Sequence, residues 1–119
     1  MTDLEDYYKL DLVDAVLSGM SYPGGRLHKK LRGKGFVYLV HGINFVGLEP
    51  GYFYIYALTN EKSIKDVETL ILNEIETLKK KPISSKEFNE AIERMRFYYK
   101  DQLSSNQSFM LLTATDELY

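Results

Sequence analysis

The stretch FVYLVHGINFVGLEPGYFYIYAL, residues 36–58, decides the fold class of this chain. Residues 36–45 are rich in Val, Ile, Tyr and Phe, and residues 52–58 alternate tyrosine with Phe, Ile and Ala. Both patterns are typical of β-strands. Because Pro50-Gly51 between them is a turn signal, the simplest interpretation is an antiparallel hairpin with the tyrosines on one face.

Helical patterns precede this hairpin. A first helix is predicted from a cap at Asp3 to a stop at Gly19, with Leu10, Val13 and Leu17 recurring at helical spacing. The segment GRLHKKLR, residues 25–32, predicts a short helix, since its two leucines lie four residues apart on one face. Gly33 and Gly35 are expected to end it.

The remainder of the chain is predicted to be helical. Thr59 or Asn60 can cap a long helix whose apolar stripe is Ile64, Val67, Ile71, Ile75 and Leu78. Ser84 and Glu87 form a capping-box pattern that opens a second long helix, whose inward positions are Phe88, Ala91, Ile92, Met95 and Tyr99. Residues 104–108, SSNQS, are expected to interrupt this helix.

The predicted order is therefore α-α-β-β-α-α, an α+β fold with an antiparallel sheet packed by helices. We expect residues 1–119 to form a single partial domain, because two strands alone are marginal in water. A sheet this small predicts either a piece of a larger protein or a protomer that self-associates as a homo-oligomer.

Composition excludes several classes of function. The chain has 119 residues, of which 45% are hydrophobic, and a formal charge of −2. That charge argues against a dedicated nucleic-acid binder, and no apolar run approaches the length that would span a membrane. The absence of cysteine excludes disulfides and favours an intracellular, cytoplasmic setting.

The glycine-rich, basic segment 21–35 does not match a phosphate-binding loop. His28 stands where such a loop needs its first glycine, Gly35 stands where it needs Ser or Thr, and the order is helix then strand. The basic side chains of this segment are more simply the solvated face of a short helix than a polyanion site. His28 and His41 form no zinc-binding motif, so no metal site is expected in this chain.

Taken together, LDLVDAVLSGM (10–20), GGRLHKKLRGKGFVYLV (24–40) and the run from PGYFYIYAL to ISSKEFNEAIERMR (50–96) resemble one family. The order and spacing of these elements are similar to those of the pitrilysin/insulinase family of zinc metallopeptidases, which includes mitochondrial processing peptidase. The resemblance implies that this chain is the second half of a repeated α+β domain, of the non-catalytic C-terminal type. The H-x-x-E-H zinc motif is absent, so zinc is expected on another part of the parent protein, and this chain is expected to be inactive alone.

The resemblance also implies a substrate-binding role for Arg32 and Tyr38, which occupy the places of a family Arg and Tyr that reach toward bound peptide. Arg is a forked, permanently charged donor for peptide carbonyls, and Tyr adds a neutral hydroxyl. The turn RGKGFVY is one residue shorter here than in the common family form. The expected partners are a peptide substrate and the remaining domains of the parent protein. Two alternatives stay open: a scaffold or interaction module of the same fold without a proteolytic role, and an unrelated α+β binding domain.

Overall fold

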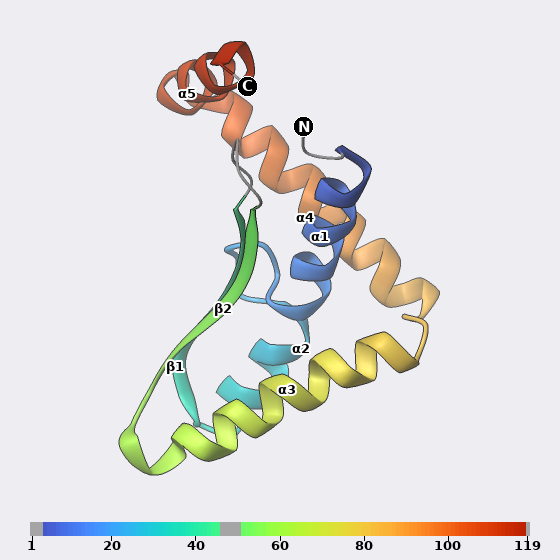
Figure 1. Ribbon diagram of the computed structural model, residues 1–119, viewed down its shortest axis with the longest axis vertical. Helices are drawn as coiled ribbons and strands as arrows, with labels where there is room; N and C mark the ends of the chain where they lie inside the picture. Colours follow the sequence, from blue (N-terminus) through green and yellow to red (C-terminus); the bar gives the residue numbers. More distant parts are fainter. Residues whose placement is uncertain (1–3, 46–50, 119) are drawn as a thin grey trace.

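The computed structural model describes residues 4–45 and 51–118 of the chain. Helices come first, then a hairpin, then the helices α3, α4 and α5 (Figure 1). The elements are α1 (Leu4–Leu17), α2 (Gly25–Leu27), the π-helix η1 (His28–Arg32), β1 (Val37–Phe45), β2 (Tyr52–Thr59), the 3₁₀-helix η2 (Glu61–Ser63), α3 (Ile64–Lys80), α4 (Ser85–Ser104) and α5 (Asn106–Leu118). The α+β prediction is confirmed. The expected cap at Asp3 and most of the hairpin turn lie outside the described residues.

The hairpin is antiparallel, and its register places Val40 opposite Ala57 and His41 opposite Tyr56. Side chains on β2 alternate strictly between exposed and half-buried positions, as expected for a sheet with one covered face. Figure 1 shows the hairpin along one side of the molecule. Helices α1, α2 and α3 all lie on the same side of the hairpin. The tyrosines of β2 therefore lie on the face that the described helices leave open.

A β-bulge interrupts the ladder near the start of β1. Val37 pairs with Thr59 and Leu39 pairs with Leu58, so Tyr38 is the extra residue and has no partner of its own. A bulge of this kind bends the strand and changes the direction of the side chain that it carries.

Helix α1 lies between the hairpin and α4 (Figure 1), so both of its sides are covered. Its Leu17 joins a core formed with α2, η1, β1 and α3, and its Ala15 and Val16 join a second core with Met20 and α4. Leu10, expected in the inward stripe, is instead 38% exposed. Because the helix is covered on two sides, a single apolar stripe does not describe it.

The predicted long helix α3 is confirmed, but it begins a few residues after the predicted cap at Asn60. The Asn60 side chain accepts a hydrogen bond from the Ser63 amide at 3.1 Å, and this cap opens η2 rather than α3 itself. Ile64 consequently sits in the first turn with its side chain exposed. Val67 is buried, and the rest of the predicted stripe packs against the first core.

Helix α4 opens with the predicted capping box. Ser84 Oγ accepts from the Glu87 amide at 3.2 Å, and Glu87 Oε2 accepts from the Ser84 amide at 3.3 Å. Ala91 is fully buried, whereas Phe88 is exposed, contrary to the predicted inward face. The predicted interruption lies at Ser105, which has an extended conformation, and α5 projects from the far end of α4 (Figure 1).

No helix within the described residues is long and apolar enough to cross a lipid bilayer.

Candidate functional site

The junction between η1 and β1 is a Schellman turn. The Phe36 amide donates to the Leu31 carbonyl at 3.0 Å, and the Gly35 amide donates to the Arg32 carbonyl at 3.0 Å. Gly35 has a φ of +71°, which a side chain would disfavour. Phe36 packs on the core that contains Leu31, the apolar contact that accompanies this motif. The turn therefore fixes how Arg32 and β1 are placed relative to each other.

Two ion-pair groups anchor the short helical segment before this turn. Arg26 donates both Nε and Nη2 to the Glu87 carboxylate, at 2.8 and 3.2 Å. This forked contact is the main cause that lowers the pKa of Glu87 to about 2. Lys30 pairs with the buried Glu74 of α3, whose other oxygen lies 4.0 Å from Arg26. Arg26 and Lys30 are thus already paired, and the polyanion interpretation loses two of its cations.

Arg32 and Tyr38, the predicted substrate-binding residues, stand on either side of the turn. Arg32 is the last residue of η1 and is exposed. Tyr38 occupies the bulge and is 72% exposed. Neither side chain forms a hydrogen bond or ion pair with the described residues. Their substrate-binding role stays a prediction.

His28 and His41 lie side by side between η1 and β1. Their rings meet edge to face with centroids 5.3 Å apart. Both nitrogens of His28 and Nδ1 of His41 are buried without a hydrogen-bond partner. Burial lowers the pKa of both imidazoles, and His28 is further affected by His41 and the Arg32 charge. Burial therefore opposes protonation of both rings inside the fold.

These histidines do not fit a zinc site. Within residues 4–45 and 51–118, no group of three or more His, Asp or Glu side chains is placed to hold a metal ion. A catalytic zinc needs three protein ligands and an open position. No chemical step in this chain is therefore assigned to zinc.

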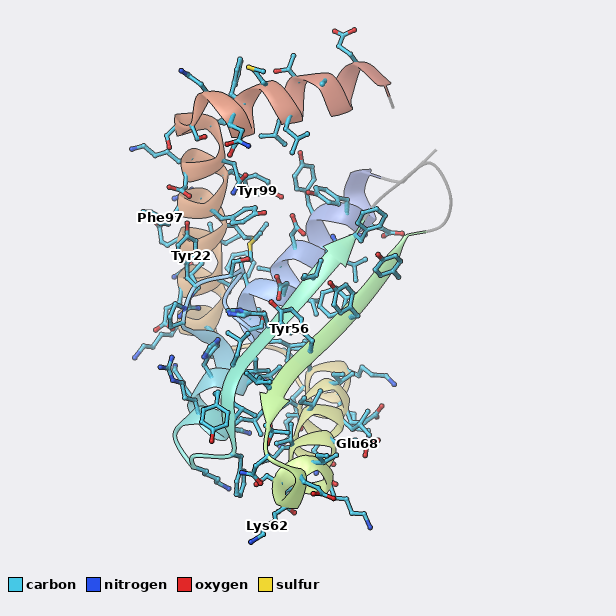
Figure 2. All side chains as sticks on the ribbon, turned by 90° about the vertical axis from the view of Figure 1, so that its left-hand side faces the viewer. Tyr22, Tyr56, Lys62, Glu68, Phe97 and Tyr99 are labelled. Atoms are coloured by element: carbon cyan, nitrogen blue, oxygen red, sulfur yellow. The ribbon has the colours of Figure 1, made fainter. Side chains whose placement is uncertain are left out.

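An aromatic row runs along the open face of the hairpin. Phe45 stacks on Tyr52 with centroids 4.9 Å apart, and Tyr52, Tyr54, Tyr56 and His41 continue the row at spacings of 5.7 to 6.0 Å. Tyr56 lies midway along the hairpin (Figure 2). Cross-strand and diagonal aromatic contacts stabilise a hairpin, so the row has a structural role even though its rings are half-exposed.

Behind the hairpin lies a buried polar network that sequence reasoning missed. The Ser18 hydroxyl donates to Asp14 Oδ1 and accepts from the Gly42 amide at 2.8 Å. Asp11 accepts from Asn44 Nδ2 at 3.0 Å and from the Tyr99 hydroxyl. The available signal was the pair of acidic residues inside the otherwise apolar run LDLVDAVL, residues 10–17.

Burial disturbs the protonation of this network. Asp11 and Asp14 are each only 5% exposed. Desolvation raises the pKa of Asp14 to about 6, opposed by its bond from Ser18 and supported by the charge of Asp11. Burial and the bond to Asp11 together raise the pKa of Tyr99 above its usual value.

The same part of the chain matches a known family. The model of the Peptidase M16 inactive domain matches residues 1–95, which include both cores and the hairpin and stop before α5. No curated protein and no solved structure matches the chain. The predicted resemblance to pitrilysin-type metallopeptidases is confirmed at the level of the family, and the chain belongs to the Peptidase M16 inactive domain family.

Proposed function

We propose that this chain is the non-catalytic part of a zinc-dependent metallopeptidase, and that it encloses and contacts the peptide substrate. In this proposal the chain is the second half of a peptidase-like domain, and another part of the parent protein carries the H-x-x-E-H motif and the zinc. The match to the Peptidase M16 inactive domain supports the non-catalytic part of this proposal. The isolated chain would then cleave no peptide.

The observation that carries the contact proposal is the pair of uncommitted donors at the Schellman turn. Arg32 and Tyr38 are exposed and unpaired within the described residues, whereas Arg26 and Lys30 of the same segment are bound to carboxylates. A guanidinium and a phenol held on a fixed turn suit the carbonyl groups of an extended peptide. Arg32 would supply the stronger, charge-assisted hydrogen bond.

The two-stranded sheet adds a second means of peptide contact. Within the described residues β1 and β2 pair only with each other, so each strand presents an unpaired edge. An extended peptide, or a strand from the rest of the parent protein, can pair with such an edge through main-chain hydrogen bonds.

The test is Arg32→Ala in the full-length parent, with Lys34→Ala as the matched control in the same turn. Loss of a charge-assisted hydrogen bond weakens binding by about 1.5–3 kcal/mol, so kcat/KM for a peptide substrate should fall by roughly 10- to 100-fold. Tyr38→Phe, which removes only a hydroxyl, should have a smaller effect. Equal activity of the Arg32→Ala and Lys34→Ala variants would remove the contact proposal.

A scaffold role on the same fold is the second candidate. It is favoured by the open aromatic row and by α5, where Phe109, Met110 and Leu111 are more than half exposed. Large exposed apolar surfaces mark sites of association, and we propose self-association of the isolated chain on the same grounds. A parent protein without H-x-x-E-H in any of its parts, and without peptidase activity, would favour this role.

A further inference from the structure

The contact between His28 and His41 lies at the outer edge of β1, where the hairpin meets η1. The Gly42 amide donates to Ser18 Oγ of α1, so the main chain of β1 points away from β2 at that residue. Main-chain groups alternate along an antiparallel ladder, so Val40, two residues earlier, points to the same outer edge. The Val40 carbonyl is near enough to His28 to favour its protonated form. His28 therefore covers the edge of β1 at Val40.

This contact buries ring nitrogens that have no hydrogen-bond partner among the described residues. They are both nitrogens of His28, whose side chain belongs to a residue only 8% exposed, and Nδ1 of His41. The large majority of buried polar side-chain atoms in proteins are hydrogen-bonded, because a buried polar group without a partner costs free energy. Hydration of the two rings would remove that cost, so the contact favours local opening more than ordinary apolar packing does.

Among the described residues, no carboxylate is placed to neutralise a protonated ring of this pair. Glu74 is bound to Lys30, and Asp14 is bonded by Ser18. His41 and the Arg32 charge oppose protonation of His28, and no carboxylate affects either ring. The charged and titratable groups on the elements that meet η1 or β1 are Arg26 of α2, Lys29, Lys30 and Arg32 of η1, Asp11 and Asp14 of α1, Tyr38 of β1, Tyr56 of β2 and Glu74 of α3.

Protonation would place two like charges at this contact. Each imidazolium carries two N–H donors and a positive charge, and the ring centroids of His28 and His41 are 5.3 Å apart. Like charges repel more strongly in the interior of a protein than in water. When the contact is open, water hydrates both rings, so the open state binds protons more readily than the closed state does.

We propose that the contact between His28 and His41 is an acid-sensitive switch: protonation of the two rings separates η1 from the edge of β1 and opens the turn between them. That turn is closed by the Phe36 and Gly35 amides, which donate to main-chain carbonyls of η1. These two hydrogen bonds break when η1 and β1 separate.

The opening is local, because the other side of the segment stays attached to the helices. Arg26 of α2 holds Glu87 of α4 through a forked contact, and the pKa of that carboxyl is about 2, so this ion pair persists at pH 5. Proteins commonly open in such local units at a lower free energy than that of global unfolding. The opened state exposes the edge of β1 and no longer fixes Arg32 relative to Tyr38. The switch does not depend on whether those two residues bind a peptide.

The test is amide hydrogen exchange of the 119-residue chain, followed by NMR between pH 7 and 5.5. The reference chain carries Asp14→Asn, because the pKa of Asp14 is about 6 and its titration would add a separate pH dependence. An open state that binds one extra proton becomes about tenfold more populated per pH unit below the usual histidine pKa. The protection factors of the Phe36 and Gly35 amides should therefore fall about tenfold over this range, and further if both rings bind a proton. The Ala91 amide of α4 should stay protected.

Substitutions show whether the two imidazoles cause the opening. His28→Phe keeps an aromatic ring at the contact but binds no proton, so the protection of the Phe36 amide should depend much less on pH. His41→Phe removes the other proton and serves as the second variant, and circular dichroism verifies that each variant is folded. Constant protection in the reference chain, or an equal fall in both phenylalanine variants, would overturn the proposal. An equal loss of protection at Ala91 would also overturn it, since the whole chain would then be unfolding.

Discussion

Replacing Asp14 by asparagine should stabilise the fold at neutral pH. Desolvation raises the pKa of Asp14 from 3.8 to about 6. Between these two pH values the folded state keeps the carboxyl proton, whereas the unfolded chain releases it. A folded pKa above the unfolded value means that ionisation destabilises the fold as pH rises from about 4 to 6. The shift corresponds to roughly 3 kcal/mol at pH 7.5. Asparagine keeps the acceptor for Ser18 and removes the charge, so it should recover much of this free energy.

The assay is urea unfolding followed by circular dichroism at several pH values between 4 and 8. The difference in unfolding free energy between Asp14→Asn and the unsubstituted chain should be largest at pH 7.5 and shrink toward zero near pH 4. Asp6→Asn is the matched control, because Asp6 is exposed and its pair with Lys9 at 3.6 Å contributes little. A variant no more stable than the unsubstituted chain at pH 7.5, or a difference independent of pH, would refute the reasoning.

Four further outcomes are expected. In the Asp14→Asn variant, the unfolding free energy should fall as pH drops below about 6.5. The pKa values of His28 and His41 are lowered in the folded state, so the unfolded chain binds protons more readily. An unfolding free energy that is constant between pH 7 and 5 would contradict this. Leu31→Ala should lower the unfolding free energy by about 2–5 kcal/mol, since this side chain is fully buried, whereas Leu58→Ala on the open face should change it by less than about 0.5 kcal/mol. Gly42→Ala should destabilise the fold, because the added Cβ would collide with the Asp14 carboxylate and lie 3.2 Å from the Phe53 ring; thermal unfolding at an unchanged temperature would count against that packing. The isolated chain should self-associate in sedimentation velocity, and a monomer at high concentration would argue against it.

Local patterns in the sequence predicted the elements well where the physical cause is local. The capping box at Ser84 and Glu87, the alternation of the β2 tyrosines and the break near Ser105 depend only on neighbouring residues, and all three are confirmed. The same holds for Leu27 and Leu31, both fully buried. Fold class and family followed from the order of these elements.

The wrong predictions concern which side chains are buried, because contacts between elements far apart in the sequence determine burial. Leu10 and Phe88 were expected to face inward and are exposed, because α1 is covered from two sides and the buried side of α4 is set by its contact with α1. The buried network of Asp11, Asp14 and Asn44 was missed for the same reason. Its members come from two elements about thirty residues apart, and only the fold brings them to one cavity.

The bulge at Tyr38 has a consequence for insertions and deletions in this segment. A shift of one residue along a strand normally sends every following side chain to the opposite face. An extra residue confined to the bulge stops that exchange, so Val40 and Gly42 remain on the buried face of β1 beyond the bulge at Tyr38. A bulge at this place would therefore let the helix-to-strand turn differ in length by one residue while the buried face of β1 stays the same.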